Sequence, residues 1–163
     1  MALSADVKIV RYGSPGNASQ PAYPGAIAAS TTVYAGSIAL TNSNGAIKNA
    51  ASPVSTDVCW GLIHSQTVNS STASQTGLIL DTLGNVMQID TGSFFVSYTT
   101  SGAQAITQSN VGQVVYVVNE TTVGANSAGN TLPAAGVLLT IDTTQPGGAA
   151  VKFGSAQSSG APQ

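Results

Sequence analysis

The residues of this sequence that could do chemistry are few and scattered. His64 is the single histidine, Cys59 is the single cysteine, and the six acidic residues do not cluster along the chain. A Ser/His/Asp triad would pair His64 with Asp57, Asp81 or Asp90, but no serine lies in a Gly-x-Ser-x-Gly elbow. Neither a zinc-ligand spacing nor a calcium loop is present. We therefore expect no enzyme activity, no metal and no cofactor.

Sugar chemistry stays open as an alternative, because six acids on different strands could supply a pair of carboxylates. Sugar sites usually carry several aromatic platforms, whereas this chain has one Trp and five Tyr in separate segments. Packing into the core or onto a sheet face is the favoured role for these rings. Cys59, between Val58 and Trp60, is expected to be a buried and inert thiol.

The low charge of the chain is its most informative property. Hydrophobic residues make up 42% of the 163 residues, enough for a real core, but charged residues make up only 6%, against about 25% in a typical domain. The surface must then consist of Ser, Thr, Asn, Gln, Gly and Ala. Such a surface suits a protein that is packed against copies of itself or a larger partner, because few charges lose their water.

The charge balance also excludes some partners. The four cations, Lys8, Arg11, Lys48 and Lys152, are dispersed and cannot neutralise many phosphates, so we expect no nucleic-acid binding. Residues 1–30 show no secretory signal pattern. No run of about 18 apolar residues exists, so no membrane-spanning helix and no membrane partner are expected.

Short strands must position whatever surface the protein uses. Residues 114–118 and 136–141 are apolar, β-branched runs separated by turn-forming residues, which predicts a hairpin in residues 111–142. An earlier stretch has the same plan. Gly61 follows Gly36 by 25 residues and Gly136 follows Gly112 by 24, which indicates an internal pseudo-repeat, with coincidence among 18 glycines as the alternative.

The remaining elements are also short strands. Residues 31–40 and Ile47 flank an Asn44-Gly45 turn, the strongest hairpin signal in the chain. Further strands are predicted at 58–63, 78–80, 86–89, 93–98 and 149–153, with a helical turn in 104–110 and an exposed polar loop at 69–75. This spacing predicts an all-β fold: a single compact β-sandwich or β-barrel over residues 31–153.

The two ends of the sequence differ from this domain. Residues 7–12 are extended, and residues 13–25 carry proline and glycine that prevent regular structure. Residues 1–30 are therefore predicted to be an extended N-terminal arm that orders on a neighbour, with a floppy terminus as the alternative. Residues 154–163 are predicted to be a polar C-terminal tail.

Several of these segments together resemble a known family. The segments are WGLI at 60–63, DTGSFFV at 90–96, VGQVVYVV at 111–118, AGVLL at 135–139 and VKF at 151–153. In that order they resemble the capsid decoration, or cement, proteins of tailed bacteriophages. The resemblance covers roughly residues 31–153 and consists of structural glycines and aliphatic residues.

The resemblance implies a structural virion protein on the outer surface of the capsid, made in the cytoplasm of the bacterial host. It implies a homotrimer that bridges neighbouring major capsid proteins and takes no small-molecule substrate. We expect the N-terminal arm to contact the capsid, with Arg11 as the polar anchor. The expected contact residues are Val7, Ile9, Arg11, Tyr12 and Tyr23, and the expected core and turn residues are Gly36, Gly45, Trp60, Gly61, Gly112 and Gly136. The alternatives are a phage tail, baseplate or fibre component, and a carbohydrate-binding β module.

Overall fold

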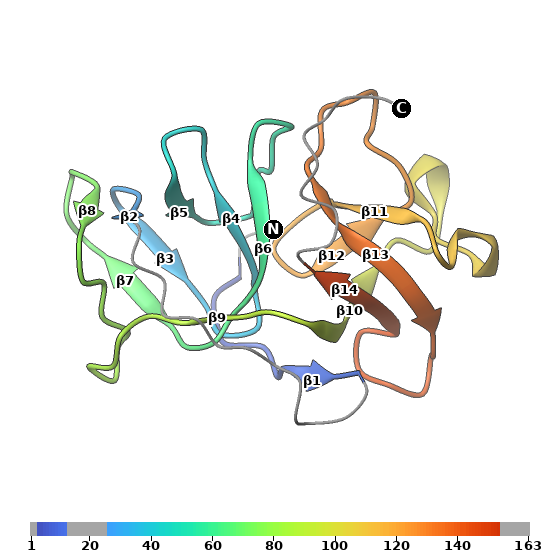
Figure 1. Ribbon diagram of the computed structural model, residues 1–163, viewed down its shortest axis with the longest axis horizontal. Coiled ribbons are helices and arrows are strands. Elements are labelled where there is room, and N and C mark those ends of the chain that lie inside the picture. The colour runs from blue at the N-terminus through green and yellow to red at the C-terminus, as the bar shows by residue number, and fades with distance from the viewer. Residues whose placement is uncertain (1–2, 13–25, 154–163) are drawn as a thin grey trace.

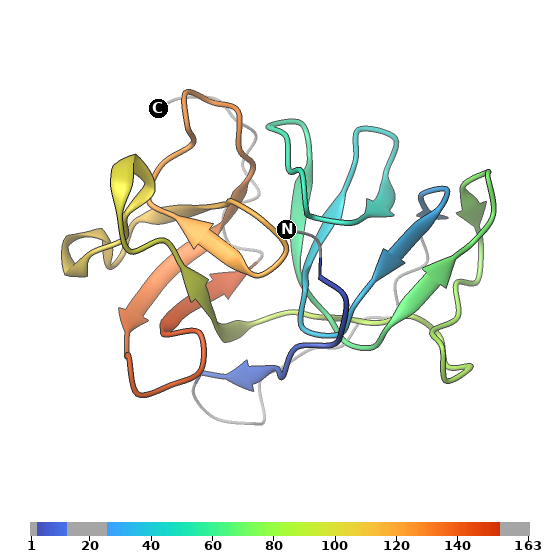
Figure 2. The ribbon, with the colours of Figure 1, turned by 180° about the vertical axis from the view of Figure 1, so that it is seen from behind.

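The computed structural model describes residues 3–12 and 26–153, and it is an all-β protein of two lobes, as Figures 1 and 2 show. The described residues contain no α-helix, only two short 3₁₀ turns, η2 (Gly102–Gln104) and η3 (Gln108–Asn110). The predicted all-β class is thereby confirmed. No helix in these residues has the length and apolar character needed to span a membrane.

The second lobe is a closed five-stranded barrel. Its strands are β10 (Ser93–Tyr98), β11 (Val114–Val117), β12 (Thr122–Gly124), β13 (Ala134–Ile141) and β14 (Ala149–Phe153). β10 pairs in parallel with β12, β12 and β13 flank β11, and β14 pairs antiparallel with both β13 and β10. The double pairing of β14 closes the barrel, so this lobe has no free sheet edge apart from β1, described below.

The first lobe is a curled half-barrel. Its strands are β2 (Ala26–Ile27), β4 (Ile38–Thr41), β5 (Ala46–Lys48), β6 (Val58–Ile63), β8 (Gln75–Thr76) and β9 (Ile89–Asp90), and they lie in the order β8-β2-β5-β4-β6-β9. A separate two-stranded ribbon joins β3 (Thr31–Val33) to β7 (Thr67–Asn69).

The two lobes repeat one strand plan, which confirms the pseudo-repeat. β4 and β6 pair antiparallel with Ala39 opposite Gly61, as β11 and β13 pair with Val115 opposite Gly136, and each pair has a register shift just after this position. The backbone N–H of Gly36 donates to Ile63 O at 2.8 Å, and that of Gly112 donates to Leu138 O at 2.8 Å. β2 pairs in parallel with β5, as β10 does with β12.

Two glycines of the repeat let a neighbouring paired strand approach the backbone very closely. A Cβ on Gly61 would lie 2.2 Å from the carbonyl oxygen of Asp90, and a Cβ on Gly136 would lie 2.2 Å from that of Lys152. Asp90 is in β9 and Lys152 is in β14, so the same close approach between paired strands occurs in both lobes. Glycine is required here because any side chain would push the neighbouring strand away.

The hydrophobic core extends across both lobes. One cluster joins first-lobe residues, among them Ile38, Leu40, Cys59 and Leu62, to second-lobe residues such as Phe94. A second cluster fills the half-barrel and includes Ile27, Ile63 and Met87. Because the larger cluster is shared, the two lobes form one packed unit.

The N-terminal segment of residues 3–12 lies across the two lobes. In the first lobe, the N–H of Val7 donates to Ala35 O at 2.7 Å, and the N–H of Ala35 donates to Asp6 Oδ1 at 2.9 Å. β1 (Val10–Arg11) then pairs antiparallel with β10 of the barrel. The segment is extended, as predicted, and its backbone binds its own domain.

Most strand predictions are confirmed. β11 pairs with β13, β10 covers the predicted residues with Phe94 and Val96 buried, and β4 and β5 form the hairpin around Asn44-Gly45. The predicted helical turn is η3, where Thr107 and Asn110 form a capping box. Leu80 and Val86 form only an isolated bridge, and the strand predicted at 86–89 begins only at Ile89, the first residue of β9.

The close approach of β14 to Gly136 gives a first prediction. Gly136→Ala should lower the free energy of unfolding by about 1–3 kcal/mol or more, because the new methyl group overlaps the backbone of β14. Urea denaturation measures the change. Thr140→Ala on the same strand is the control, and its loss should stay below about 1 kcal/mol, the span of strand propensities. If Gly136→Ala were as stable as wild type, β14 would not lie this close to Gly136.

Candidate functional site

The histidine and one carboxylate meet where the N-terminal segment passes between the lobes. His64 Nδ1, just after β6, lies 3.1 Å and 3.2 Å from the two carboxylate oxygens of Asp90. Asp90 is 1% exposed, and Arg11 Nη2 lies 3.8 Å from its Oδ1. The Arg11 guanidinium also lies over the ring of Phe94, 5.7 Å from its centroid.

This cluster resembles the orienting half of a hydrolytic triad, in which a buried carboxylate holds Nδ1 of a histidine. The other two carboxylates considered for such a triad are held elsewhere: Asp57 binds Lys48 and Asp81 binds Ser65. Asp90 is also shared with Arg11 of the N-terminal segment. These contacts give Asp90 a structural role, because its carboxylate joins β9 to the end of β6 and to β1.

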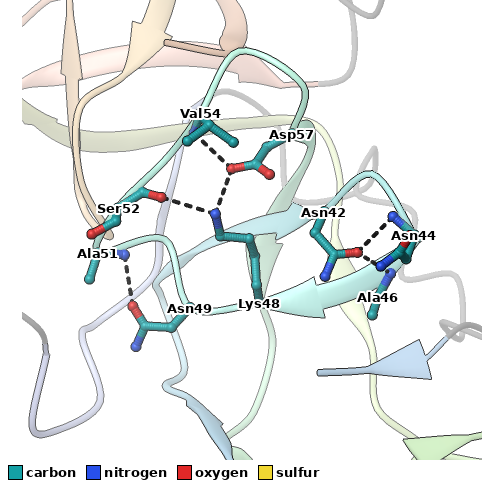
Figure 3. Close-up of polar contacts among 9 residues, drawn as sticks. All are labelled: Asn42, Asn44, Ala46, Lys48, Asn49, Ala51, Ser52, Val54 and Asp57. Carbon is teal, nitrogen blue, oxygen red and sulfur yellow. Dashed lines mark hydrogen bonds and ion pairs between the residues drawn. The ribbon is translucent and has the colours of Figure 1, made fainter. Parts of the chain in front are cut away.

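A second polar cluster lies beside the β5–β6 loop (Figure 3). Lys48 Nζ donates to Asp57 Oδ2 at 2.8 Å and to Ser52 O at 2.9 Å, and the N–H of Val54 donates to the same Asp57 oxygen at 2.9 Å. The side chain of Asp57 is 1% exposed and that of Lys48 is 22% exposed. The other carboxylate oxygen of Asp57, Oδ1, is buried and has no hydrogen-bond partner among the described residues. The pair fixes the loop to the hairpin.

Two further carboxylates are buried by the fold. Burial alone would raise the pKa of Asp81, but hydrogen bonds from Ser65 Oγ and from backbone N–H groups at Asn85, Leu83 and Gly84 lower this pKa below its ordinary value. Glu120 is 2% exposed and accepts a hydrogen bond from the N–H of Leu3. Each of these carboxylates orders a segment of backbone.

The last two acids are used in the same way. Asp6 accepts the N–H of Ala35, and Asp142 accepts the N–H of Thr144 at 3.0 Å and its Oγ1 at 2.6 Å. The hydrogen bonds from Thr144 lower the pKa of Asp142. All six carboxylates of the sequence thus bind groups of their own chain. Within residues 3–12 and 26–153, no three or more His, Cys, Asp or Glu side chains gather where they could hold a metal ion.

Cys59 is buried, as predicted. It is 4% exposed, and burial raises the pKa of its thiol to about 12, although a backbone hydrogen bond at Gly61 opposes the rise. Since the thiolate is the reactive form, this thiol is inert in the folded protein.

The expected capsid-contact residues fall into two groups. Val7 and Tyr12 are exposed, at 38% and 41%, and the ring of Tyr12 packs edge-on against Phe95 with centroids 5.6 Å apart. Ile9 packs against the shared core, and Arg11 is bound to Asp90. Tyr23 lies outside the described residues.

The expected core and turn residues take several positions. Gly36, Gly45 and Gly112 have positive φ, at 79°, 76° and 84°. Gly61 and Gly136 lie where a neighbouring strand approaches the backbone closely. Trp60 was expected in the core, but it is 37% exposed and its indole N–H donates to Thr41 Oγ1 at 3.0 Å. The reason is the alternation of β6, which points Cys59 into the shared core and Trp60 to the opposite face.

Sequence reasoning missed the exposure of three leucines that lie close together in the chain. Leu78, Leu80 and Leu83 are 72%, 47% and 78% exposed, although residues 78–80 were expected to form a strand. The available signal was the turn chemistry of Asp81, Gly84 and Asn85, which interrupts the apolar run.

Comparisons with models of protein families, with curated proteins and with solved structures found no match to this chain.

The Lys48–Asp57 pair gives a second prediction. Lys48→Met should lower the free energy of unfolding by about 3–5 kcal/mol at neutral pH, because it leaves the Asp57 carboxylate buried without its cation. Chemical denaturation measures the loss. Lys8→Met, at an exposed position, is the control. Adding Asp57→Asn to Lys48→Met should restore part of the stability, and no recovery would show that the charge was not the cause.

Cys59 gives a third prediction. At pH 8, iodoacetamide should leave the folded chain unmodified and should label Cys59 fully in denaturant, because burial holds the thiol protonated and out of reach. Intact mass spectrometry counts the added groups. Rapid labelling of the folded chain would mean that β6 opens readily.

Proposed function

We propose that this protein is a structural virion protein that binds the outside of a tailed-phage capsid as a homotrimer. It stabilises the shell by bridging neighbouring major capsid proteins and performs no chemistry. The proposal rests on the family resemblance in residues 31–153 and on the way the chain uses its charges.

The observation that carries the proposal is the internal use of every carboxylate. Asp57, Asp81, Asp90 and Glu120 are buried, and Asp6 and Asp142 bind backbone N–H groups of their own chain. Of the cations, Arg11 and Lys48 bind buried acids. The remaining surface is close to neutral, so covering it with protein removes water from few charges. A nearly neutral surface therefore supports a protein whose function is to stay bound to other proteins.

The mechanism is mass action. A ligand that binds the expanded shell, and not its dissociated subunits, stabilises the shell in proportion to occupancy. Three linked contacts in a trimer multiply modest affinities, because the second and third contacts form at high effective concentration. Val7 and Tyr12 are the exposed members of the proposed capsid contact.

A carbohydrate-binding module is the second candidate, and the exposure of Trp60 favours it. Stacked sugar rings need neighbouring aromatic platforms, however. Tyr12 lies beside β10 in the barrel, whereas Trp60 lies on β6 in the half-barrel, and Tyr34, Tyr98 and Tyr116 are half-buried. The separation of these rings favours the capsid role.

The fourth prediction concerns shell binding. The purified chain, mixed with expanded tailed-phage heads stripped of external proteins, should bind saturably in multiples of three copies and raise the temperature at which the heads break. Co-sedimentation and calorimetry measure the two effects. Val7→Thr with Tyr12→Ser should weaken binding, and Lys8→Ala is the control on the same segment. The proposal would be overturned if the chain did not bind the heads but bound immobilised glycans through Trp60.

A further inference from the structure

We propose that copies of this chain bind one another through residues 70–88 of the first lobe. Within this stretch, residues 77–88 form what we call the leucine loop, because Leu78, Leu80 and Leu83 project from it. The proposal rests on the trimer of the proposed function and adds the location of its contact.

The leucine loop lies where the two lobes differ. In the barrel, β14 runs without a break and pairs with both β13 and β10. In the half-barrel, the equivalent pairings are divided: β8 pairs with β2, β9 pairs with β6, and residues 77–88 leave the sheet between them (Figure 1). An insertion that interrupts the closing strand exposes apolar side chains that the other lobe does not have at this position.

Two residues of the leucine loop anchor it in the core of the half-barrel. Ile79 and Met87 are 3% and 0% exposed and pack in the core of the half-barrel, while Leu78 and Leu83 are each more than 70% exposed. Single exposed apolar residues are ordinary at protein surfaces, but here three exposed leucines lie within six residues of sequence. The outward leucines are therefore available for contact with another molecule.

The loop is also held in one conformation. Asp81 Oδ1 accepts the N–H groups of Leu83 and Asn85, both at 2.9 Å, and the N–H of Thr82 donates to Gln66 O at 2.8 Å. Gly84 supplies the positive φ of 82° that the turn needs. A surface held in this way loses little entropy on binding.

The chemistry of the loop favours a second copy as its occupant. A lipid surface is held by cations beside the apolar residues, but residues 70–88 contain no Lys or Arg. Their single charge, Asp81, is bound within the turn. Three copies of this neutral surface can meet around a threefold axis without like-charge repulsion, even though each chain carries a net charge of −2.

Solubility points the same way. Two leucines that are more than 70% exposed are an aggregation liability in a free chain that must diffuse to a distant partner. A copy of the same chain is present wherever the chain is made, so it covers the leucines before a capsid is met.

The extent of the surface is adequate. Every residue from 70 to 78 is exposed, as are Val68, Leu80 and residues 82–85. A stable interface uses about 20–30 residues from each partner, so this surface supplies a large part of one side. Ser, Thr and Gln surround the leucines, which matches the apolar centre and polar rim of protein interfaces.

The test changes the leucines without changing the fold. Leu78→Gln with Leu83→Gln should weaken self-association at least about 100-fold, because burying each leucine is worth about a factor of ten or more. Sedimentation equilibrium of the full chain measures the association, and thermal unfolding verifies that the variant folds. Val54→Thr with Val114→Thr, which alters exposed residues at 47% and 37%, is the matched control and should associate like wild type.

The outcomes separate this proposal from the preceding one. Loss of the trimer in the leucine variant alone supports the leucine loop as the interface. A leucine variant that remains trimeric, or a wild-type chain that is monomeric at all concentrations, overturns it. Binding of the wild-type chain to stripped heads decides the capsid role independently, and a leucine variant that stays trimeric but no longer binds heads would assign the loop to the capsid.

Discussion

The close approach of neighbouring strands at Gly61 and Gly136 is the constraint on which the rest of the structure depends. At each site the carbonyl oxygen of a neighbouring strand occupies the place where a side chain would be. In the barrel this contact brings β14 against β13 and lets it reach β10, which closes the sheet. In the half-barrel the same contact places Asp90, whose side chain then holds His64 and Arg11. The polar cluster between the lobes follows from the geometry of the repeat.

A substantial part of this architecture could be predicted from sequence. The glycine spacing indicates the repeat because Gly36 and Gly112 have equivalent hydrogen bonds, and the Asn44-Gly45 turn determines its hairpin locally. Local turn chemistry and β-branched runs carry information that a single segment contains.

The parts that escaped prediction depend on distant partners. Glu120 stands in a polar turn, and its buried carboxylate accepts the N–H of Leu3, which is 117 residues away in sequence. The parallel pairing of β10 with β12 and the outward direction of Trp60 depend on register, which one segment does not encode. Arg11 looked like an available anchor in the sequence, but its binding to Asp90 appears only when β1 and β9 are brought together.

The core shared by the two lobes sets how the molecule unfolds. Tandem repeats often melt in stages, since each unit contacts only its neighbour through a small surface. Here Cys59 and Leu62 of one lobe are buried in the same cluster as Phe94 and Val115 of the other. Separating the lobes would divide this shared cluster and expose apolar residues of both, while the half-barrel would keep its own smaller cluster. Because the larger cluster joins the two lobes, we expect them to unfold together in one transition.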